Sequence, residues 1–175
     1  MKPMKNIIKT SLLLALMFVI SACEKQTEYV YVGKNWKALH QLSQQQPSFR
    51  VTAKIKKQYK VGEKLTLNIF SENAGKLWVI QVDEQDKVTF ISPSVLFKDQ
   101  MIAANETRNL PASNSPISIK ATKPVGESLF AVIITTQKLN WQANENEEQQ
   151  LSELITAIKQ TSNWSANSYI VKVID

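Results

Sequence analysis

Two short stretches decide the fold of this chain: LWVIQV at residues 77–82 and LFAVII at residues 129–134. Both are apolar at nearly every position, whereas a strand with one face in water alternates apolar and polar residues. Both are also rich in β-branched and aromatic side chains, which favour strands. We therefore expect two central strands that are covered on both faces.

Shorter strand patterns lie on either side of these stretches. Apolar and polar residues alternate over residues 49–55 and 65–69, and VTFI at residues 88–91 follows a polar hairpin loop. A last strand is expected over residues 169–174. The stretch 93–116 is rich in Pro, Asn and Ser, and we expect it to be the longest irregular segment and a binding surface.

Two helices complete the expected fold. Asn35 is the expected cap of a short N-terminal helix. A C-terminal helix is indicated by an apolar stripe at helical spacing, made of Leu151, Leu154, Ile155 and Ile158. Frequent strand and turn signals favour a β-sandwich. The sequence thus predicts a mainly β fold, an Ig-like β-sandwich with these two helices, and the alternative is an α+β fold.

The first 22 residues are typical of an export signal. Lys2, Lys5 and Lys9 precede an apolar run at residues 12–20, and small residues follow it. The run is shorter than the roughly 20 residues that span a bilayer as a helix. We expect residues 1–22 to be removed as a signal peptide.

The end of this segment, ISAC at residues 20–23, resembles the lipobox of bacterial lipoproteins. The resemblance implies cleavage between Ala22 and Cys23, attachment of diacylglycerol to the Cys23 thiol, and acylation of the new amine, for example by palmitate. The alternative is an ordinary signal peptide with an incidental cysteine, but Cys23 is the only cysteine and stands where the motif requires it. Two or more lipid chains anchor a protein stably.

The residue after the cysteine favours one membrane over the other. Glu24 departs from the aspartate that retains enteric lipoproteins in the inner membrane. We therefore expect an outer-membrane protein that faces the periplasm, and the inner membrane and the cell surface stay open as alternatives.

The mature chain is expected to be a tether at residues 23–34 followed by one domain at residues 35–175. Within the tether, YVYV at residues 29–32 has strand preference, so a first strand is the alternative there. Removal of residues 1–22 takes away three lysines and no acidic residue, so the formal net charge falls from +6 to +3. Half of the charge that pointed to an anionic partner therefore belongs to the export signal.

The central motif region, at about residues 50–137, resembles a known family. Its motifs are YKVGEKL at residues 59–65, GKLWV at 75–79, VTFISP at 88–93, IAANET at 102–107 and PVGE at 124–127. They resemble the domain-of-unknown-function family four-three-eight-four, although Asn105 stands where that family usually has glycine and Trp78 where it often has tyrosine. The resemblance implies a β-sandwich in a secreted or envelope protein, often beside enzymatic or secretion-associated modules. It brings no catalytic residues.

The residues offer little for catalysis. His40 is the only histidine and lies on the expected short helix, away from any serine motif. One Cys and one His cannot make a Cys/His zinc site. Asp83, Glu84 and Asp86 share a hairpin loop but lack the ligand number of a calcium loop, so we expect a solvated turn. We therefore expect no enzyme activity, no metal and no cofactor apart from the covalent lipid.

A lysine-rich segment is the first set of candidate contact residues. It consists of Lys54, Lys56, Lys57, Lys60 and Lys64. Two interpretations stand: contact with anionic headgroups, lipopolysaccharide or an acidic partner, and protection of an edge strand against pairing, which is favoured. Lys54 and Lys56 are expected on the outward face of one strand.

Three tryptophans are the second set of candidate contact residues. Trp36, Trp141 and Trp164 lie at the ends of expected elements and are candidate interface anchors, because Trp is enriched at binding hot spots. Trp78 is expected in the core. Packing with a partly wet indole is the alternative for all three.

These observations favour a non-catalytic interaction module of an outer-membrane lipoprotein, docked onto an envelope or secretion-system protein. The alternative is a small-ligand or lipid carrier with an apolar cavity inside the sandwich. No nucleic-acid partner is expected for an exported chain, and the sequence leaves the oligomeric state open.

Lipidation has a direct test. Cys23→Ser should abolish labelling of the protein by a palmitate analogue in cells, because it removes the thiol that accepts diacylglycerol. Glu24→Gln keeps the cysteine and should label like the natural sequence. Labelling that persists in Cys23→Ser would show that the lipobox resemblance is incidental.

Overall fold

The two apolar stretches form neighbouring strands of a six-stranded sheet. In this computed structural model, which describes residues 33–98, 100–139, 141 and 146–175, β5 (Gly75–Val82) pairs antiparallel with β10 (Gly126–Thr135). On the far side of β10 the sheet continues with β11 (Trp164–Ile174) and then β2 (Gln58–Lys60). On the far side of β5, both β6 (Val88–Ser92) and β7 (Gln100–Ile102) pair with β5 itself. The predicted pair of central strands is confirmed.

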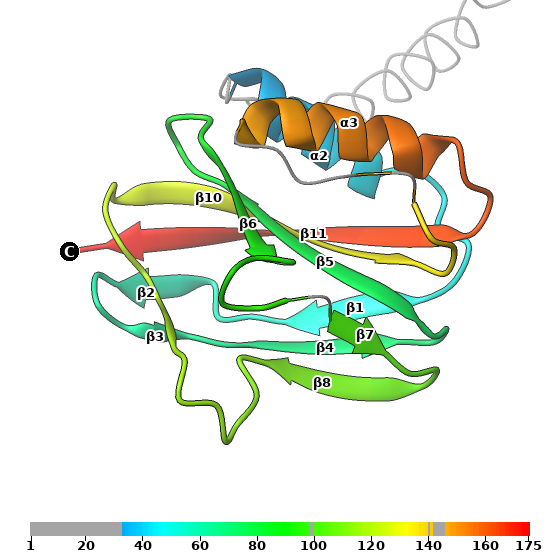
Figure 1. The fold of residues 1–175 in the computed structure, drawn as a ribbon. Coiled ribbons are helices and arrows are strands. Elements are labelled where there is room, and N and C mark those ends of the chain that lie inside the picture. The colour runs from blue at the N-terminus through cyan, green and yellow to red at the C-terminus, as the bar shows by residue number, and fades with distance from the viewer. Residues whose placement is uncertain (1–32, 99, 140, 142–145) are drawn as a thin grey trace, which may run out of the picture. The chain divides into compact units, whose positions relative to one another are not determined.

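Both faces of this sheet are covered, as the unbroken apolar runs predicted. Along β5, Leu77 and Val79 point into one hydrophobic cluster, and Trp78 and Ile80 point into another on the opposite face. The first cluster is closed by a second sheet, of order β1 (Val51–Lys54), β4 (Leu67–Ser71) and β8 (Glu106–Leu110). The second is closed by α2 (Gly33–Ser43) and α3 (Glu147–Lys159), which lie together across the larger sheet (Figure 1). The predicted β-sandwich is confirmed, with a helical layer added outside it.

Three expected segments have different boundaries. The strand expected over residues 65–69 is split, because β3 (Lys64–Leu65) pairs with β9 (Ile119–Lys120) whereas β4 belongs to the three-stranded sheet. The stretch 93–116 was expected to be irregular, yet it contains β7 and β8. β8 is an edge strand whose polar residues face solvent, so its sequence, ETRNL, lacks an apolar run.

The last strand also begins earlier than expected, at Trp164. Its first half contains polar side chains because they bond to backbone groups of residues 49–53. Ser165, Asn167 and Tyr169 bond with the outer edge of β1 and with Phe49, two residues before it, and we call them the side-chain ladder. The Ser165 hydroxyl accepts from the Phe49 N–H at 2.9 Å and donates to the Phe49 carbonyl at 2.6 Å. The Asn167 amide donates to the Val51 carbonyl at 3.4 Å.

Tyr169 completes the side-chain ladder. Its hydroxyl accepts from the Ala53 N–H, and burial raises the pKa of the phenol, so the group stays neutral. The ladder therefore satisfies β1 backbone groups that no neighbouring strand reaches, which is one way to protect a sheet edge.

The two helices are where the sequence predicted them, with one correction. Buried side chains of α2 include Trp36, Leu39 and Leu42, and those of α3 are the predicted stripe with Gln150. Asn35 is not the cap of α2, which begins at Gly33 and so includes the last two residues of the expected tether. Neither of the two described helices is long and apolar enough to cross a membrane.

The side-chain ladder predicts a specific stability loss. Ser165→Ala should lower the free energy of unfolding by about 1–3 kcal/mol, because it leaves the buried Phe49 N–H and carbonyl without their partner. Ser152→Ala, on the exposed face of α3, should change it by less than about 0.5 kcal/mol. Urea unfolding of both variants measures the difference, and equal stabilities would contradict the assigned role of Ser165.

Candidate functional site

The lipidation and cleavage residues, Ala22 and Cys23, lie outside the described residues. The structure therefore leaves them as predictions from the sequence.

The predicted lysine segment is exposed, and it winds through several elements. Lys54 is the last residue of β1, Lys56 and Lys57 lie in the following loop, Lys60 is in β2 and Lys64 is in β3. The expectation that Lys54 and Lys56 share one strand is therefore wrong, because β1 ends at Lys54. β2 is the outermost strand of the six-stranded sheet, so its placement agrees with edge protection by lysine.

One of these lysines is held by a carboxylate. The Lys56 ammonium lies 2.7 Å from the Glu63 carboxylate and 5.4 Å from the Tyr59 ring centroid. Glu63 also accepts from the Lys60 N–H at 2.9 Å, and these bonds hold the pKa of its carboxyl below the ordinary value. The pair fixes the turn between β2 and β3 and is exposed to solvent, so it adds little to stability.

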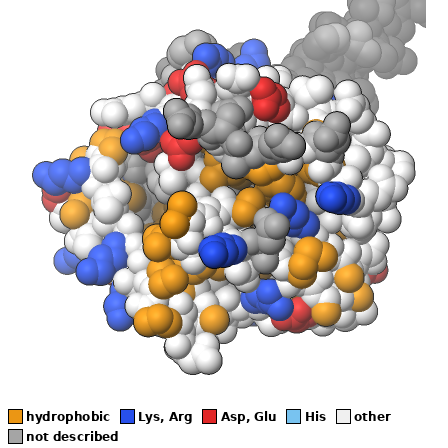
Figure 2. Space-filling view, in the orientation of Figure 1, with side chains coloured by type: hydrophobic (Ala, Val, Ile, Leu, Met, Phe, Trp, Pro, Cys, Tyr) orange, Lys and Arg blue, Asp and Glu red, His pale blue; other side chains and the backbone are white. Residues whose placement is uncertain are grey.

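Two further lysines, distant in sequence, join the segment in space. Lys120 lies directly opposite Lys64 in the β3–β9 pair, and Lys172 lies beside Gln58 in the β2–β11 pair. Directly opposed like charges repel each other, so an anion beside them would be stabilised. Figure 2 shows Lys and Arg side chains gathered at the end of the domain that carries β2, β3 and the C-terminus in Figure 1.

The three candidate anchor tryptophans pack inward. Trp36 and Trp164 are only 6% and 9% exposed and belong to the cluster under the helices. Trp141 is half-buried, and its ring meets Trp78 edge-on at 5.0 Å between centroids, while its N–H donates to the Gln150 carbonyl. The structure thus assigns Trp36, Trp141 and Trp164 to packing, which was the alternative interpretation, and confirms Trp78 in the core.

Residues considered for metal or catalytic chemistry are dispersed. In the described ranges no three His, Cys, Asp or Glu side chains lie close enough to hold a metal ion. His40 is on α2, and its Nδ1 is buried without a hydrogen-bond partner among the described residues.

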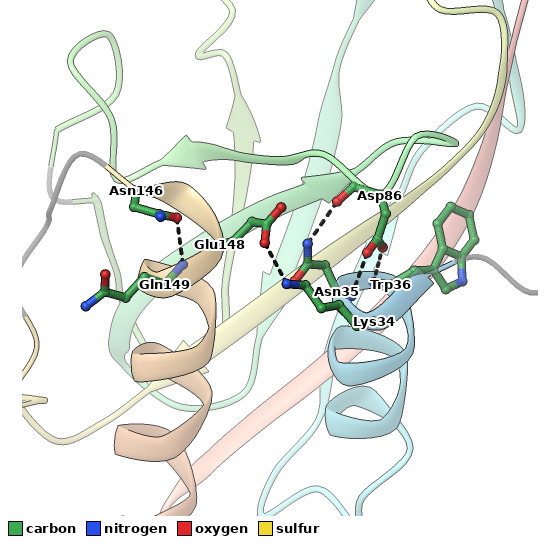
Figure 3. A network of polar contacts seen from close by, with 7 residues as sticks. All are labelled: Lys34, Asn35, Trp36, Asp86, Asn146, Glu148 and Gln149. Atoms are coloured by element: carbon green, nitrogen blue, oxygen red, sulfur yellow. Dashed lines mark hydrogen bonds and ion pairs between the residues drawn. The ribbon is translucent and has the colours of Figure 1, made fainter.

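One residue of the acidic hairpin has a role that the sequence did not indicate. Asp86, in the loop between β5 and β6, caps the N-terminus of α2 from a distance: its carboxylate accepts the N–H of Asn35 at 3.0 Å and of Trp36 at 2.9 Å (Figure 3). The Asn35 amide in turn donates to the Asp86 carbonyl at 2.9 Å. Gly33 has φ 81°, and a side chain there would overlap the Asp86 carboxyl group, so glycine fits this helix start.

A second contact joins the same helix end to α3. The Lys34 ammonium lies 2.8 Å from the Glu148 carboxylate, and this bond raises the pKa of Lys34 and lowers that of Glu148 (Figure 3). Asn146 caps α3 itself by accepting the Gln149 N–H at 3.0 Å. We call the bonds of Asp86 with Asn35 and Trp36, together with the Lys34–Glu148 pair, the helix–hairpin clamp. The clamp fixes the helical layer on the sheet.

Apolar side chains are exposed in the stretch that the sequence proposed as a binding surface. Val95 is 92% exposed, Leu96 is 62% exposed, and Met101 on β7 is 58% exposed. Phe97 between them is buried, and its N–H bonds to the Ser94 hydroxyl at 3.1 Å. The loop is thus anchored by one aromatic ring and presents its two aliphatic neighbours to solvent, and we call Val95, Leu96 and Met101 the apolar loop surface.

The helix–hairpin clamp can be tested by removing its central carboxylate. Asp86→Ala should lower the free energy of unfolding by about 1–3 kcal/mol, because two helix N–H groups lose their acceptor and alanine must adopt a positive φ. Asp86→Asn keeps an acceptor and tolerates that φ, so we expect a loss below about 1 kcal/mol. Gln85→Ala, in the same loop, is the control for chemical denaturation. An Asp86→Ala variant as stable as the control would contradict the capping role.

Comparison with known proteins agrees with the motif resemblance. No curated protein and no solved structure matches the chain. A family model described as "Domain of unknown function (DUF4384)" matches residues 58–138, from β2 to just beyond the end of β10. The match lies mostly within the region where the sequence motifs were found. Residues 58–138 are therefore similar to the DUF4384 family, and this matched region supplies most of the strands of the sandwich.

Proposed function

We propose that this protein is a non-catalytic lipoprotein, anchored through Cys23 in the outer membrane and facing the periplasm. Its β-sandwich docks onto another protein of an envelope or secretion assembly. The lipobox supports the anchor, and the lack of an aspartate at position 24 supports the outer membrane. The DUF4384 match supports the folded module but names no partner.

The observation that carries the docking role is the apolar loop surface. An exposed Val or Leu gains about 1.5–3 kcal/mol when it is fully buried, so a loop that presents both to water is suited to being covered by a partner. The buried Phe97 holds this loop against the domain, which reduces the ordering cost of binding.

Site-specific photo-crosslinking tests this proposal. A photoreactive residue at position 95 or 96, in cells that express the full chain, should give a crosslinked product with one envelope protein. The same residue at Thr156, on the exposed face of α3, should not give this product. We also expect the double variant V95D/L96D to lose at least about tenfold of the crosslink formed from position 101, because charged groups resist burial.

The outcomes distinguish a specific docking surface from exposed apolar residues that bind no partner. Equal crosslinking from positions 95 and 156 would show that the apolar loop surface is not specific. The lack of any protein product from either position, in cells where deletion of the gene has a phenotype, would overturn the docking role altogether.

A further inference from the structure

The six-stranded sheet has an unfilled gap along β11. On one side β11 pairs with β10 over residues 164–173, but on the other side it pairs with β2 only at Lys172–Ile174. The backbone of residues 48–57 bonds to the β11 backbone only at the two ends of the gap, because β1 belongs to the other sheet. Between these ends, only the side chains of Asn167 and Tyr169 reach β1. We call Ala166 to Ile170 the open edge, and its five residues span about 17 Å.

The hydrogen-bonding direction of the open edge follows from its ends. In a strand the N–H and C=O of one residue point to the same side, and this side alternates along the chain. The Lys172 N–H donates outward to the Lys57 carbonyl at 2.8 Å, and the Trp164 carbonyl accepts outward from the Ser48 N–H at 3.3 Å. The even-numbered residues of β11 therefore direct their backbone groups away from β10.

Three residues of the open edge share this direction: Ala166, Ser168 and Ile170. Within the described part of the chain, no backbone group bonds to theirs on the outward side. The Ser168 N–H donates locally instead, to the Asn167 side-chain oxygen at 2.9 Å. The N–H and carbonyl groups of Ala166 and Ile170 thus form an unpaired strand edge with which an added strand can bond.

A groove borders the start of this edge. It has a volume of about 510 Å³ and is lined by Ser43, Pro47, residues 49–52, Ala166 and Asn167. A single extended peptide needs only the width of one strand beside the open edge, about 4.8 Å, whereas a second copy of this domain would bring a whole folded sheet to it. The groove therefore favours a peptide strand over a second copy of this domain.

The charge around the groove selects the kind of peptide. Arg50 is the charged residue in its lining, and its guanidinium is held over the Phe70 ring at 4.9 Å. Lys54 continues the exposed face of β1, and Lys57 and Lys172 meet at the other end of the gap. These cations repel a second copy of the same edge and attract carboxylates. The same positive charge therefore protects the edge against self-pairing and favours an acidic partner.

We propose that the open edge of β11 binds an acidic, extended peptide segment of a partner protein as an added β-strand. This inference rests on the proposed docking role and adds a second contact, distinct from the apolar loop surface. Backbone bonds to Ala166, Ser168 and Ile170 hold the segment, and Arg50 with the neighbouring lysines selects its acidic side chains.

The test uses capped synthetic peptides and the folded chain from residue 24. The probe is TEVEVET, in which alternation places every Glu on one face of a strand. TKVKVKT reverses the charge, and TEVEPET removes one backbone donor while keeping the acids. Titration followed by amide NMR should show saturable binding of TEVEVET, at least about tenfold slower hydrogen exchange at the Ala166 and Ile170 amides, and at least about tenfold weaker binding of both other peptides.

Two sets of variants locate the site. Ile170→Pro removes an outward N–H without touching the β10 ladder and should weaken TEVEVET at least about tenfold, whereas Ile170→Thr keeps the N–H and should bind like the natural chain. R50E/K54E alters only exposed side chains and should reverse the preference, so that TKVKVKT binds better than TEVEVET. This gain of binding does not depend on whether the proline variant folds.

Each result is decisive. Slowed exchange at Ala166 and Ile170 with reversed charge preference supports the inference. Binding of TEVEVET that leaves these two amides unchanged, or no binding at millimolar peptide, overturns it. Failure here together with a specific crosslink from position 95 leaves the docking role intact and removes only the open edge, whereas loss of the crosslink removes the docking role itself.

Discussion

The fold depends on one constraint: β5 and β10 carry apolar side chains on both faces, so the sheet that contains them must be covered twice. Leu77 and Val79 need the three-stranded sheet, and Trp78 and Ile80 need the helices. A two-layer sandwich would leave one of these faces in water, at a cost of about 25 cal/mol for each Å² of apolar surface. The helical layer is therefore required by the central strands.

Polar contacts at the margins of the helical layer and the two sheets hold these three layers together. Asp86 fixes the start of α2 to the β5–β6 hairpin, and the side-chain ladder fixes β1 to β11. In both places a side chain satisfies backbone groups that regular secondary structure leaves open. Each contact joins segments far apart in the sequence, so it stabilises the arrangement of layers rather than a single element.

The same margins supply the surfaces proposed for binding. Because β1 crosses to the second sheet, β11 keeps an open edge, and because Phe97 is buried, its aliphatic neighbours are exposed. The lysines fit this arrangement in two ways: they protect the outer strand β2, and they bring positive charge to the end of the gap in β11. The surfaces proposed for binding thus arise from how the sheets are closed.

The sequence alone determined which segments are buried and what kind of fold they make. Unbroken apolar runs, the stripe of α3 and the DUF4384 motifs depend on local patterns, and these predicted the sandwich and both helices. They also predicted an exposed lysine segment, whereas the contact surface after β6 stays a prediction.

Only the tertiary structure decided the roles of Asp86, Ser165, Asn167 and the tryptophans. A cap or ladder contact between distant residues has no sequence spacing, because the partners meet only when the layers pack. A polar strand such as β8 lacks the apolar alternation by which strands are recognised, and half-buried tryptophans look the same in sequence whether they pack inward or face a partner. The open edge of β11 is likewise absent from any local pattern, since it is defined by a strand that pairs elsewhere.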